Sequence, residues 1–222
     1  MRFWIFWKLI SYIVDVPIEE GTDSQGNIIQ LAIRKGQFLL TSPKMIYSYG
    51  NRYKVLQEAY RFFNVYSMKP ASVLLLGAGI GSGLQLINEH KIIPDVVFVE
   101  KEPLICQWFM KLVKPHLKFR DIEIISSDAY KTVKQLHGPF DLIVVDLFVD
   151  DMVPKFVGSE DFVKNVLRVC SSNGLIIINI TKFPESNRQI AKNIKSILSR
   201  LSIEYTTFEV GEKNIVYGIR RK

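Results

Sequence analysis

From residue 71 onward, the sequence alternates short, almost uninterrupted apolar runs with longer stretches of helical character. Five of the apolar runs have the length of a β-strand: Ser72–Leu76, Asp95–Glu100, Ile122–Ser126, Asp141–Asp146 and Gly174–Ile180. Strands that are apolar on both faces are typical of a parallel sheet covered by helices on both sides. Because strands and helices alternate, the sequence predicts an α/β fold with a doubly wound, mostly parallel, Rossmann-like sheet and right-handed crossovers.

The two ends of the chain add elements to this predicted sheet. Ile203–Val210 and Ile215–Arg220 resemble the closing antiparallel hairpin of class I methyltransferase folds. Before residue 67, the segments Asn27–Ile33 and Gln37–Thr41 have the pattern of short strands, and Tyr53–Asn64 has helical spacing. We therefore predict a small N-terminal β-hairpin region plus a helix at residues 1–66 and a ligand-binding Rossmann-like domain at residues 67–222.

Composition restricts the class of protein. A hydrophobic fraction of 48% with 23% charged residues indicates a globular chain and not a disordered one. Cys106 and Cys170 lie far apart and match no metal-ligand spacing, so we interpret them as buried thiols in a reducing, cytoplasmic setting. His90, His116 and His137 are dispersed along the chain, and we predict no metal site.

Two features raise the question of a membrane or nucleic-acid partner. The first sixteen residues are rich in Trp and Phe, but Lys8 and Asp15 interrupt the apolar run, so the segment is too short and too polar to span a bilayer. We expect it to pack its aromatic side chains on the body of the protein, and a membrane-surface contact is the alternative. The net charge is +7, but the basic residues are scattered, which favours a solvated basic surface and no nucleic-acid partner.

The carboxyl ends of the strands are where open α/β sheets bind ligands. The first run leads into Gly77-Ala-Gly79-Ile-Gly81-Ser-Gly83, whose glycines would let the backbone approach a ligand closely. The second run ends at Glu100, at the place where an acidic residue commonly accepts hydrogen bonds from a ribose diol. A tight turn and a solvated glutamate are the alternatives. Together, the two features indicate a nucleoside-bearing ligand.

The third and fourth strand ends narrow the ligand and suggest the chemistry. Ser82 occupies the sixth place, where a dinucleotide fingerprint has glycine. Asp128-Ala129 resembles the pair that contacts adenine in S-adenosylmethionine-type proteins, although Asp128 could also cap the following helix. Asp146 ends the fourth run, where a carboxylate could orient a nucleophile or take its proton. Beyond it, Asp150 and Asp151 either contact a cationic substrate or lie in an exposed loop.

Residues 71–180 resemble the spermidine synthase-like branch of the class I S-adenosylmethionine-dependent methyltransferase-fold superfamily. The resemblance is carried by Val73–Gly79, Val99-Glu100, Asp128-Ala129 and Phe140–Asp146. It implies an S-adenosylmethionine-type ligand, a small-molecule acceptor and a homodimer. The implied ligand contacts are Gly77, Gly79, Gly81, Glu100, Asp128 and Ala129, with Asp146 as the catalytic residue and Asp150 and Asp151 as acceptor contacts.

The main functional prediction from the sequence is methyl transfer from S-adenosylmethionine to a small acceptor. In the aminopropyltransferases of the resembled family, small residues, a second aspartate and a proline follow the strand-four aspartate, whereas Leu147-Phe148-Val149 precede Asp150 here. The first alternative is polyamine aminopropyl transfer from decarboxylated S-adenosylmethionine, in which Asp146 would deprotonate the attacking amine. The second alternative is a non-catalytic nucleoside- or nucleic-acid-binding protein.

Overall fold

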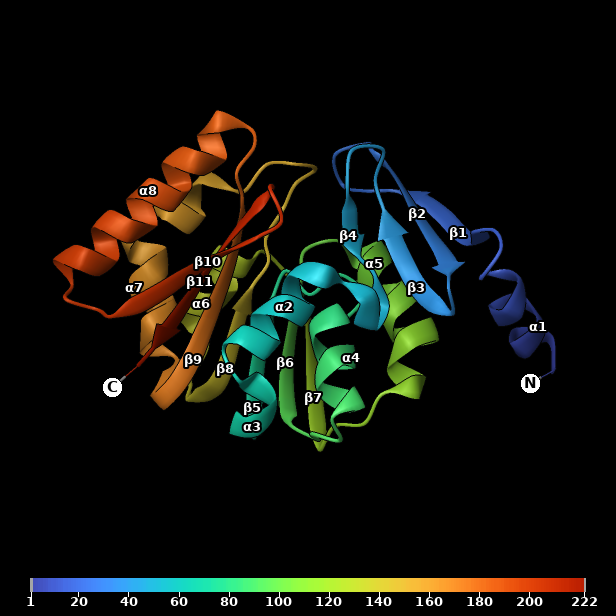
Figure 1. Ribbon diagram of the computed structural model, residues 1–222, viewed down its shortest axis with the longest axis horizontal. Coiled ribbons are helices and arrows are strands. Elements are labelled where there is room, and N and C mark those ends of the chain that lie inside the picture. The colour runs from blue at the N-terminus through green and yellow to red at the C-terminus, as the bar shows by residue number, and fades with distance from the viewer. Residues whose placement is uncertain (1, 222) are drawn as a thin grey trace.

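The computed structural model describes residues 2–221, with side chains described from residue 6 onward (Figure 1). The helices are α1 (Arg2–Ile10), α2 (Lys54–Phe62), α3 (Val65–Met68), α4 (Ser82–Glu89), α5 (Pro103–Trp108), α6 (Ala129–Gln135), α7 (Glu160–Arg168) and α8 (Glu185–Arg200). The strands are β1 (Val16–Thr22), β2 (Ile28–Arg34), β3 (Gln37–Thr41), β4 (Ile46–Ser48), β5 (Ser72–Leu76), β6 (Asp95–Glu100), β7 (Asp121–Ser126), β8 (Phe140–Val145), β9 (Cys170–Thr181), β10 (Tyr205–Val210) and β11 (Asn214–Arg220).

A seven-stranded sheet in the order β10-β11-β9-β8-β5-β6-β7 forms the centre of the molecule. The strands β5 to β9 are parallel, and β11 and β10 close the sheet as an antiparallel hairpin. This arrangement confirms the predicted doubly wound, mostly parallel sheet. The chain winds outward in one direction from β5 through β6 to β7 and in the other from β8 to β9. The crevice between β5 and β8 is therefore the topological switch point, where such sheets bind ligands.

Helices cover both faces of the sheet, as the apolar strands require (Figure 1). Successive residues of a strand point to opposite faces. Val73 and Leu75 face the layer that contains α2 and α4, and Leu74 and Leu76 face the layer that contains α6, α7 and α8. All four side chains are buried.

The N-terminal region forms an antiparallel sheet in the order β1-β2-β3-β4. The side chains of Ile29, Leu31 and Ile33 on β2 are buried in the same hydrophobic cluster as Leu75 of the large sheet. The predicted boundary between residues 66 and 67 lies inside α3, and the core runs continuously across it. The division into two domains therefore stays a prediction.

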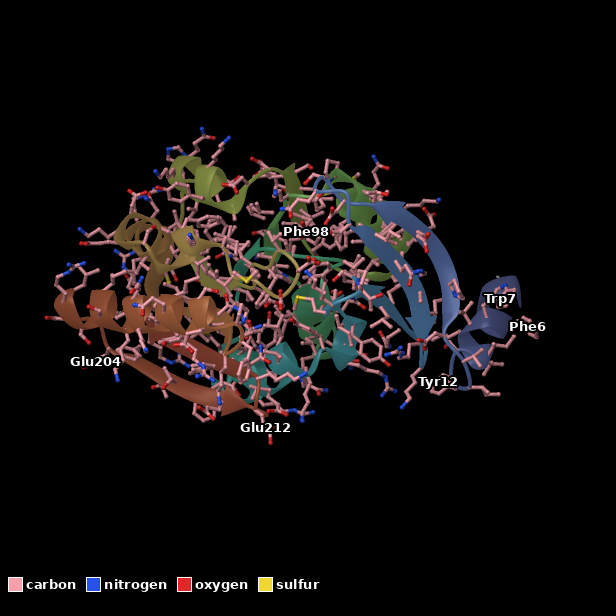
Figure 2. All side chains as sticks on the ribbon, turned by 90° about the horizontal axis from the view of Figure 1, so that it is seen from above. Phe6, Trp7, Tyr12, Phe98, Glu204 and Glu212 are labelled. Atoms are coloured by element: carbon pink, nitrogen blue, oxygen red, sulfur yellow. The ribbon has the colours of Figure 1, made fainter. Side chains whose placement is uncertain are left out.

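The aromatic N-terminal segment forms α1, at the end of the small sheet farthest from the large one (Figure 1). Trp7 and Ile10 pack against the core, whereas Phe6 and Ile13 are 55% and 87% exposed. Figure 2 shows Phe6 and Tyr12 at one extremity of the molecule, with Phe98 near its middle. Among residues 2–221, no helix is long and apolar enough to cross a membrane. Contact with a membrane surface stays a prediction.

Candidate active site

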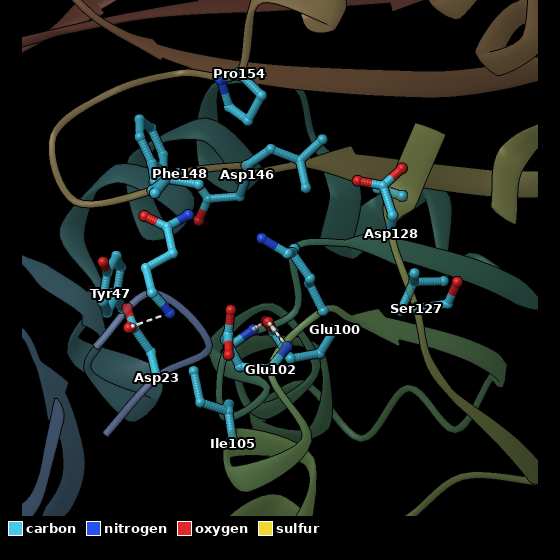
Figure 3. A pocket seen from close by; sticks show the side chains of 18 of the residues that line it. Asp23, Tyr47, Glu100, Glu102, Ile105, Ser127, Asp128, Asp146, Phe148 and Pro154 are labelled. Atoms are coloured by element: carbon cyan, nitrogen blue, oxygen red, sulfur yellow. Dashed lines mark hydrogen bonds between the residues drawn. The ribbon is translucent and has the colours of Figure 1, made fainter. Parts of the chain in front are cut away.

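A cavity of about 200 Å³ opens at the carboxyl ends of β5, β6, β7 and β8 (Figure 3). Its floor is built by strand ends of the large sheet and by the loops that follow them. The small sheet adds Asp23 and Gln25 from the β1–β2 turn, Ile29 from β2 and Tyr47 from β4. The cavity therefore lies where the topology of the sheet places a ligand, with the N-terminal sheet as one wall.

The glycine loop after β5 lets two backbone segments meet at the cavity. Gly77 and Gly79 line it. Gly77 has φ of 80°, and a Cβ on it would lie 2.4 Å from the carbonyl oxygen of Asp146. Gly81 does not line the cavity, since it precedes α4 at φ of 79° and a Cβ there would lie 2.8 Å from the Phe109 ring. The approach of the Phe109 ring gives one reason for glycine here, and the ligand contact at Gly81 stays a prediction.

Glu100 is buried at the end of β6, with its carboxylate beside the glycine loop. One oxygen accepts a hydrogen bond from the Gly79 N–H at 2.8 Å, and the other accepts from the Glu102 N–H at 3.1 Å. Burial raises the pKa of Glu100, and these two backbone N–H groups oppose the shift. An ionised carboxylate has about four lone-pair sites, so two hydrogen bonds leave it able to accept more. Glu100 can therefore still bind the hydroxyl groups of a ligand.

Asp128 and Ala129 follow β7 and also line the cavity. The Asp128 Oδ1 atom accepts a hydrogen bond from the Lys131 N–H at 3.0 Å, so Asp128 caps the N-terminus of α6. The capping alternative for Asp128 is therefore confirmed. Contact of this pair with adenine stays a prediction, and its place in the lining is compatible with both roles.

Asp146 follows β8 at the meeting point of the cavity walls. The side-chain amide of Asn179 donates a hydrogen bond to its Oδ1 atom at 2.8 Å, and the buried Tyr53 hydroxyl also hydrogen-bonds to it. Asn214 donates to the Asn179 Oδ1 atom at 2.9 Å, which points the amide nitrogen of Asn179 toward Asp146. Burial raises the pKa of Asp146 to about 6, against the effect of its two hydrogen-bond donors. A carboxyl group with a pKa near the working pH is suited to proton transfer.

Asp150 and Asp151 lie outside the lining of the cavity, and their contact with the acceptor stays a prediction. Asp150 has φ of 50°, its N–H donates to the Tyr47 hydroxyl at 2.8 Å, and its carboxylate lies 3.2 Å from the Lys44 ammonium. Asp151 is exposed, and its backbone carbonyl accepts a hydrogen bond from Asn187 at 2.8 Å. The side chains that line the cavity here are those of Leu147, Phe148 and Val149.

The sequence analysis missed several residues of the site. Asn179 had a detectable signal, because it is a polar residue inside the otherwise apolar run Leu175–Ile180 of β9. The β1–β2 turn had no such signal in the sequence, because its contact with the site spans 78 positions. Ser24 donates hydrogen bonds to the Glu102 carboxylate from its N–H at 2.8 Å and from its hydroxyl at 2.7 Å. These bonds hold Asp23 and Gln25 over the cavity.

The charge of the cavity is opposite to that of the whole chain. Among the described residues, five carboxylates line it and a single basic side chain, Lys101, does so; the carboxylates are those of Asp23, Glu100, Glu102, Asp128 and Asp146. The chain as a whole has a net charge of +7. The site therefore favours a positively charged ligand. Within residues 2–221, no group of three or more His, Cys, Asp or Glu side chains is placed to hold a metal ion.

Comparison with known proteins places this site in a family. A family model described as the spermine/spermidine synthase domain matches residues 57–212. The chain belongs to the spermine/spermidine synthase family. Among curated members, a polyamine aminopropyltransferase of Sulfolobus acidocaldarius is 23% identical over 214 residues, which cover 92% of this chain and 66% of that protein. One of Methanocaldococcus jannaschii is 27% identical over 129 residues, 56% of this chain and 43% of that protein.

The family assignment confirms the resemblance found in the sequence. A spermidine synthase structure from Thermotoga maritima has a TM-score of 0.66 and 14% identity, covering 93% of this chain and 73% of that one, and it supports the fold alone. This chain spans between 43% and 66% of the two curated family members' lengths. Both are named as aminopropyltransferases, which favours the first alternative from the sequence over methyl transfer, the main prediction. Methyl transfer gains no support from these family members.

Proposed function

We propose that the protein transfers an aminopropyl group from decarboxylated S-adenosylmethionine to an amine. The observation that carries the proposal is the cavity lined by five carboxylates and one lysine in a basic chain. The decarboxylated donor has a sulfonium and an ammonium group and no carboxylate, so it carries two positive charges. S-adenosylmethionine has a carboxylate in addition, and Lys101 alone would be available to pair with it in this cavity. The names of the curated relatives support the same proposal.

The residues of the cavity fit such a donor. Glu100 has free lone pairs for a ribose diol, and Asp128 with Ala129 lies at the neighbouring strand end, within reach of an adenine ring. Gly77 and Gly79 present backbone without side chains between this end and Asp146. The carboxylates of Asp23 and Glu102 supply negative charge for the ammonium group of the donor.

Asp146 would act as the proton acceptor in the reaction. The bound sulfonium supplies an activated carbon, so the protein has to orient the acceptor and remove its proton. The amine nitrogen forms a bond to the propyl carbon while the carbon–sulfur bond breaks, and that bonding pair stays on sulfur as a neutral thioether. Asp146 takes the proton lost by the nitrogen and passes it to solvent. Its pKa of about 6 keeps it ionised for this task at neutral pH.

The proposal is tested by supplying the protein with either donor and a mixture of small amines, followed by mass spectrometry. We expect aminopropylated amine and methylthioadenosine from the decarboxylated donor and no product from S-adenosylmethionine. Calorimetric titration with each donor, with NAD as the control, should show binding of the decarboxylated form. Methylated products formed from S-adenosylmethionine would overturn the proposal and restore methyl transfer.

A further inference from the structure

One end of the cavity is apolar where it adjoins Asp146. Leu147, Phe148 and Val149 line it directly after the aspartate, and Pro154 and Phe156 complete the wall. Figure 3 shows Phe148 and Pro154 on the same side of the cavity as Asp146, with Asp23 and Glu102 on the opposite side. An acceptor whose amine reaches Asp146 would therefore extend its remaining atoms along hydrocarbon.

Asp150, the residue directly after Val149, already has its carboxylate paired. The Asp150 Oδ2 atom lies 3.2 Å from the Lys44 ammonium, and its Oδ1 atom lies 3.5 Å from the Tyr47 hydroxyl. The Asp150 side chain is only 16% exposed, and it does not line the cavity. Lys44 therefore occupies the position that a second substrate ammonium would need in order to reach Asp150.

Four carboxylates of the cavity remain, and all of them accept hydrogen bonds from other groups; that of Asp128 caps α6. Glu102 accepts two hydrogen bonds from Ser24, and Glu100 accepts from Gly79 and Glu102. Asp23 accepts from the N–H groups of Gln25 at 2.9 Å and Asn27 at 2.8 Å. These groups face the donor in the proposed function, so no carboxylate of the lining is left to pair with a second ammonium beside Phe148 and Phe156. An unpaired charge at an apolar surface is strongly disfavoured.

We infer that the acceptor is a small primary amine with a single positive charge and an apolar chain, and not a diamine. The inference rests on the proposed aminopropyl transfer and names the class of amine that the same site accepts. The attacking ammonium is neutralised by proton transfer to Asp146, and the apolar chain is buried against the Leu147–Val149 segment, Pro154 and Phe156. A second ammonium group would be neither neutralised by Asp146 nor stabilised by contact with these apolar side chains.

The test compares butylamine with 1,4-diaminobutane, which differ only in the terminal amino group. With saturating decarboxylated S-adenosylmethionine, we expect kcat/KM for butylamine to exceed that for 1,4-diaminobutane by at least about tenfold, the effect of one unfavourably placed charge. Equal or better use of 1,4-diaminobutane would overturn the inference and leave aminopropyl transfer standing. No transfer to either amine would overturn the proposed function, and the inference with it.

A second variant tests the role of the Lys44–Asp150 pair. Lys44→Gln removes the cation that neutralises Asp150, so kcat/KM for 1,4-diaminobutane should rise several-fold while that for butylamine stays unchanged. Lys54→Gln is the matched control, because Lys54 is also exposed and paired with a carboxylate, Glu58, but does not line the cavity. An unchanged ratio of the two amines in Lys44→Gln would overturn the assigned role of the pair.

Discussion

The two ends of the cavity are built in different ways. At the donor end, the strand ends of β5, β6 and β7 supply backbone N–H groups, glycines and carboxylates, and the sheet topology fixes their positions. At the acceptor end, the wall comes from the loop after β8. Asp150 in this loop is paired with Lys44 of the β3–β4 loop, 106 positions away in the sequence. The donor end is therefore determined by the topology of the sheet, and the acceptor end by a few tertiary contacts of the loop after β8.

Asp146 lies between the two ends, and its replacement should have the largest effect. Asp146→Asn removes the proton acceptor but keeps the hydrogen bond from Asn179, so we expect kcat to fall about 10³-fold with little change in donor affinity. Steady-state rates and calorimetric titration with decarboxylated S-adenosylmethionine measure the two quantities separately. Asp151→Asn is the control, since Asp151 is exposed and outside the lining. A comparable loss in Asp151→Asn would restore the role that the sequence suggested for that residue.

The second prediction concerns the close approach of β5 and β8 at the donor end. Gly77→Ala places a methyl group 2.4 Å from the Asp146 carbonyl oxygen in a positive-φ backbone, whereas Gly211→Ala meets no atom within 4 Å at φ of 57°. We expect the free energy of unfolding to fall by about 2–5 kcal/mol for Gly77→Ala and by about 1–2 kcal/mol for Gly211→Ala. Urea denaturation of both variants measures the difference. Equal losses would mean that backbone strain alone, and not the approach of the two strands, requires glycine at position 77.

The sequence predicted the strand ends that build the donor end, and it did not predict the tertiary contacts around Asp146 and Asp150. The runs ending at Leu76, Glu100 and Ser126 were predicted to the residue at their carboxyl ends, because apolar periodicity and parallel topology place those ends at one edge. The hydrogen bond of Tyr53 to Asp146 and the pairing of Lys44 with Asp150 were missed. Contacts between residues so far apart in the chain are decided by how the layers pack, and a single sequence carries no periodic signal for them.

The third prediction tests whether the donor end acts independently of the acceptor end. Glu100→Ala removes the acceptor for the Gly79 N–H as well as the proposed ribose contact, so donor affinity should fall by about 1–3 kcal/mol, roughly 5- to 150-fold. Calorimetric titration gives this value, and KM for butylamine at saturating donor should stay within about twofold. An unchanged donor affinity would remove Glu100 from the site. A parallel change in both constants would show that the two ends are coupled through the glycine loop.

The smallest expected effect concerns how far water solvates the Asp146 carboxylate at the acceptor end. The pKa of Asp146 is about 6 in the folded protein and has an ordinary value of 3.8, so ionisation of Asp146 costs native stability, and this cost builds up as pH rises from 3.8 through about 6. Asp146→Asn should therefore be more stable than the wild type at pH 8. Because the carboxylate borders a cavity that water can enter, we expect a gain of about 1–2 kcal/mol, less than full burial would give.

The pH dependence of that gain separates ionisation from any other effect of the Asp146→Asn substitution. As pH falls below 3.8, the wild-type carboxyl becomes protonated in the unfolded as well as the folded chain, so the stability difference should shrink toward zero. Urea denaturation of both proteins at several pH values from below 3.8 up to 8 follows this change, with Asp151→Asn as a variant that should show no such trend. A gain that is the same at every pH would arise from packing and not from charge. If Asp146→Asn were no more stable than the wild type at pH 8, water would solvate the Asp146 carboxylate fully. The apolar wall beside it would then discriminate poorly between butylamine and 1,4-diaminobutane.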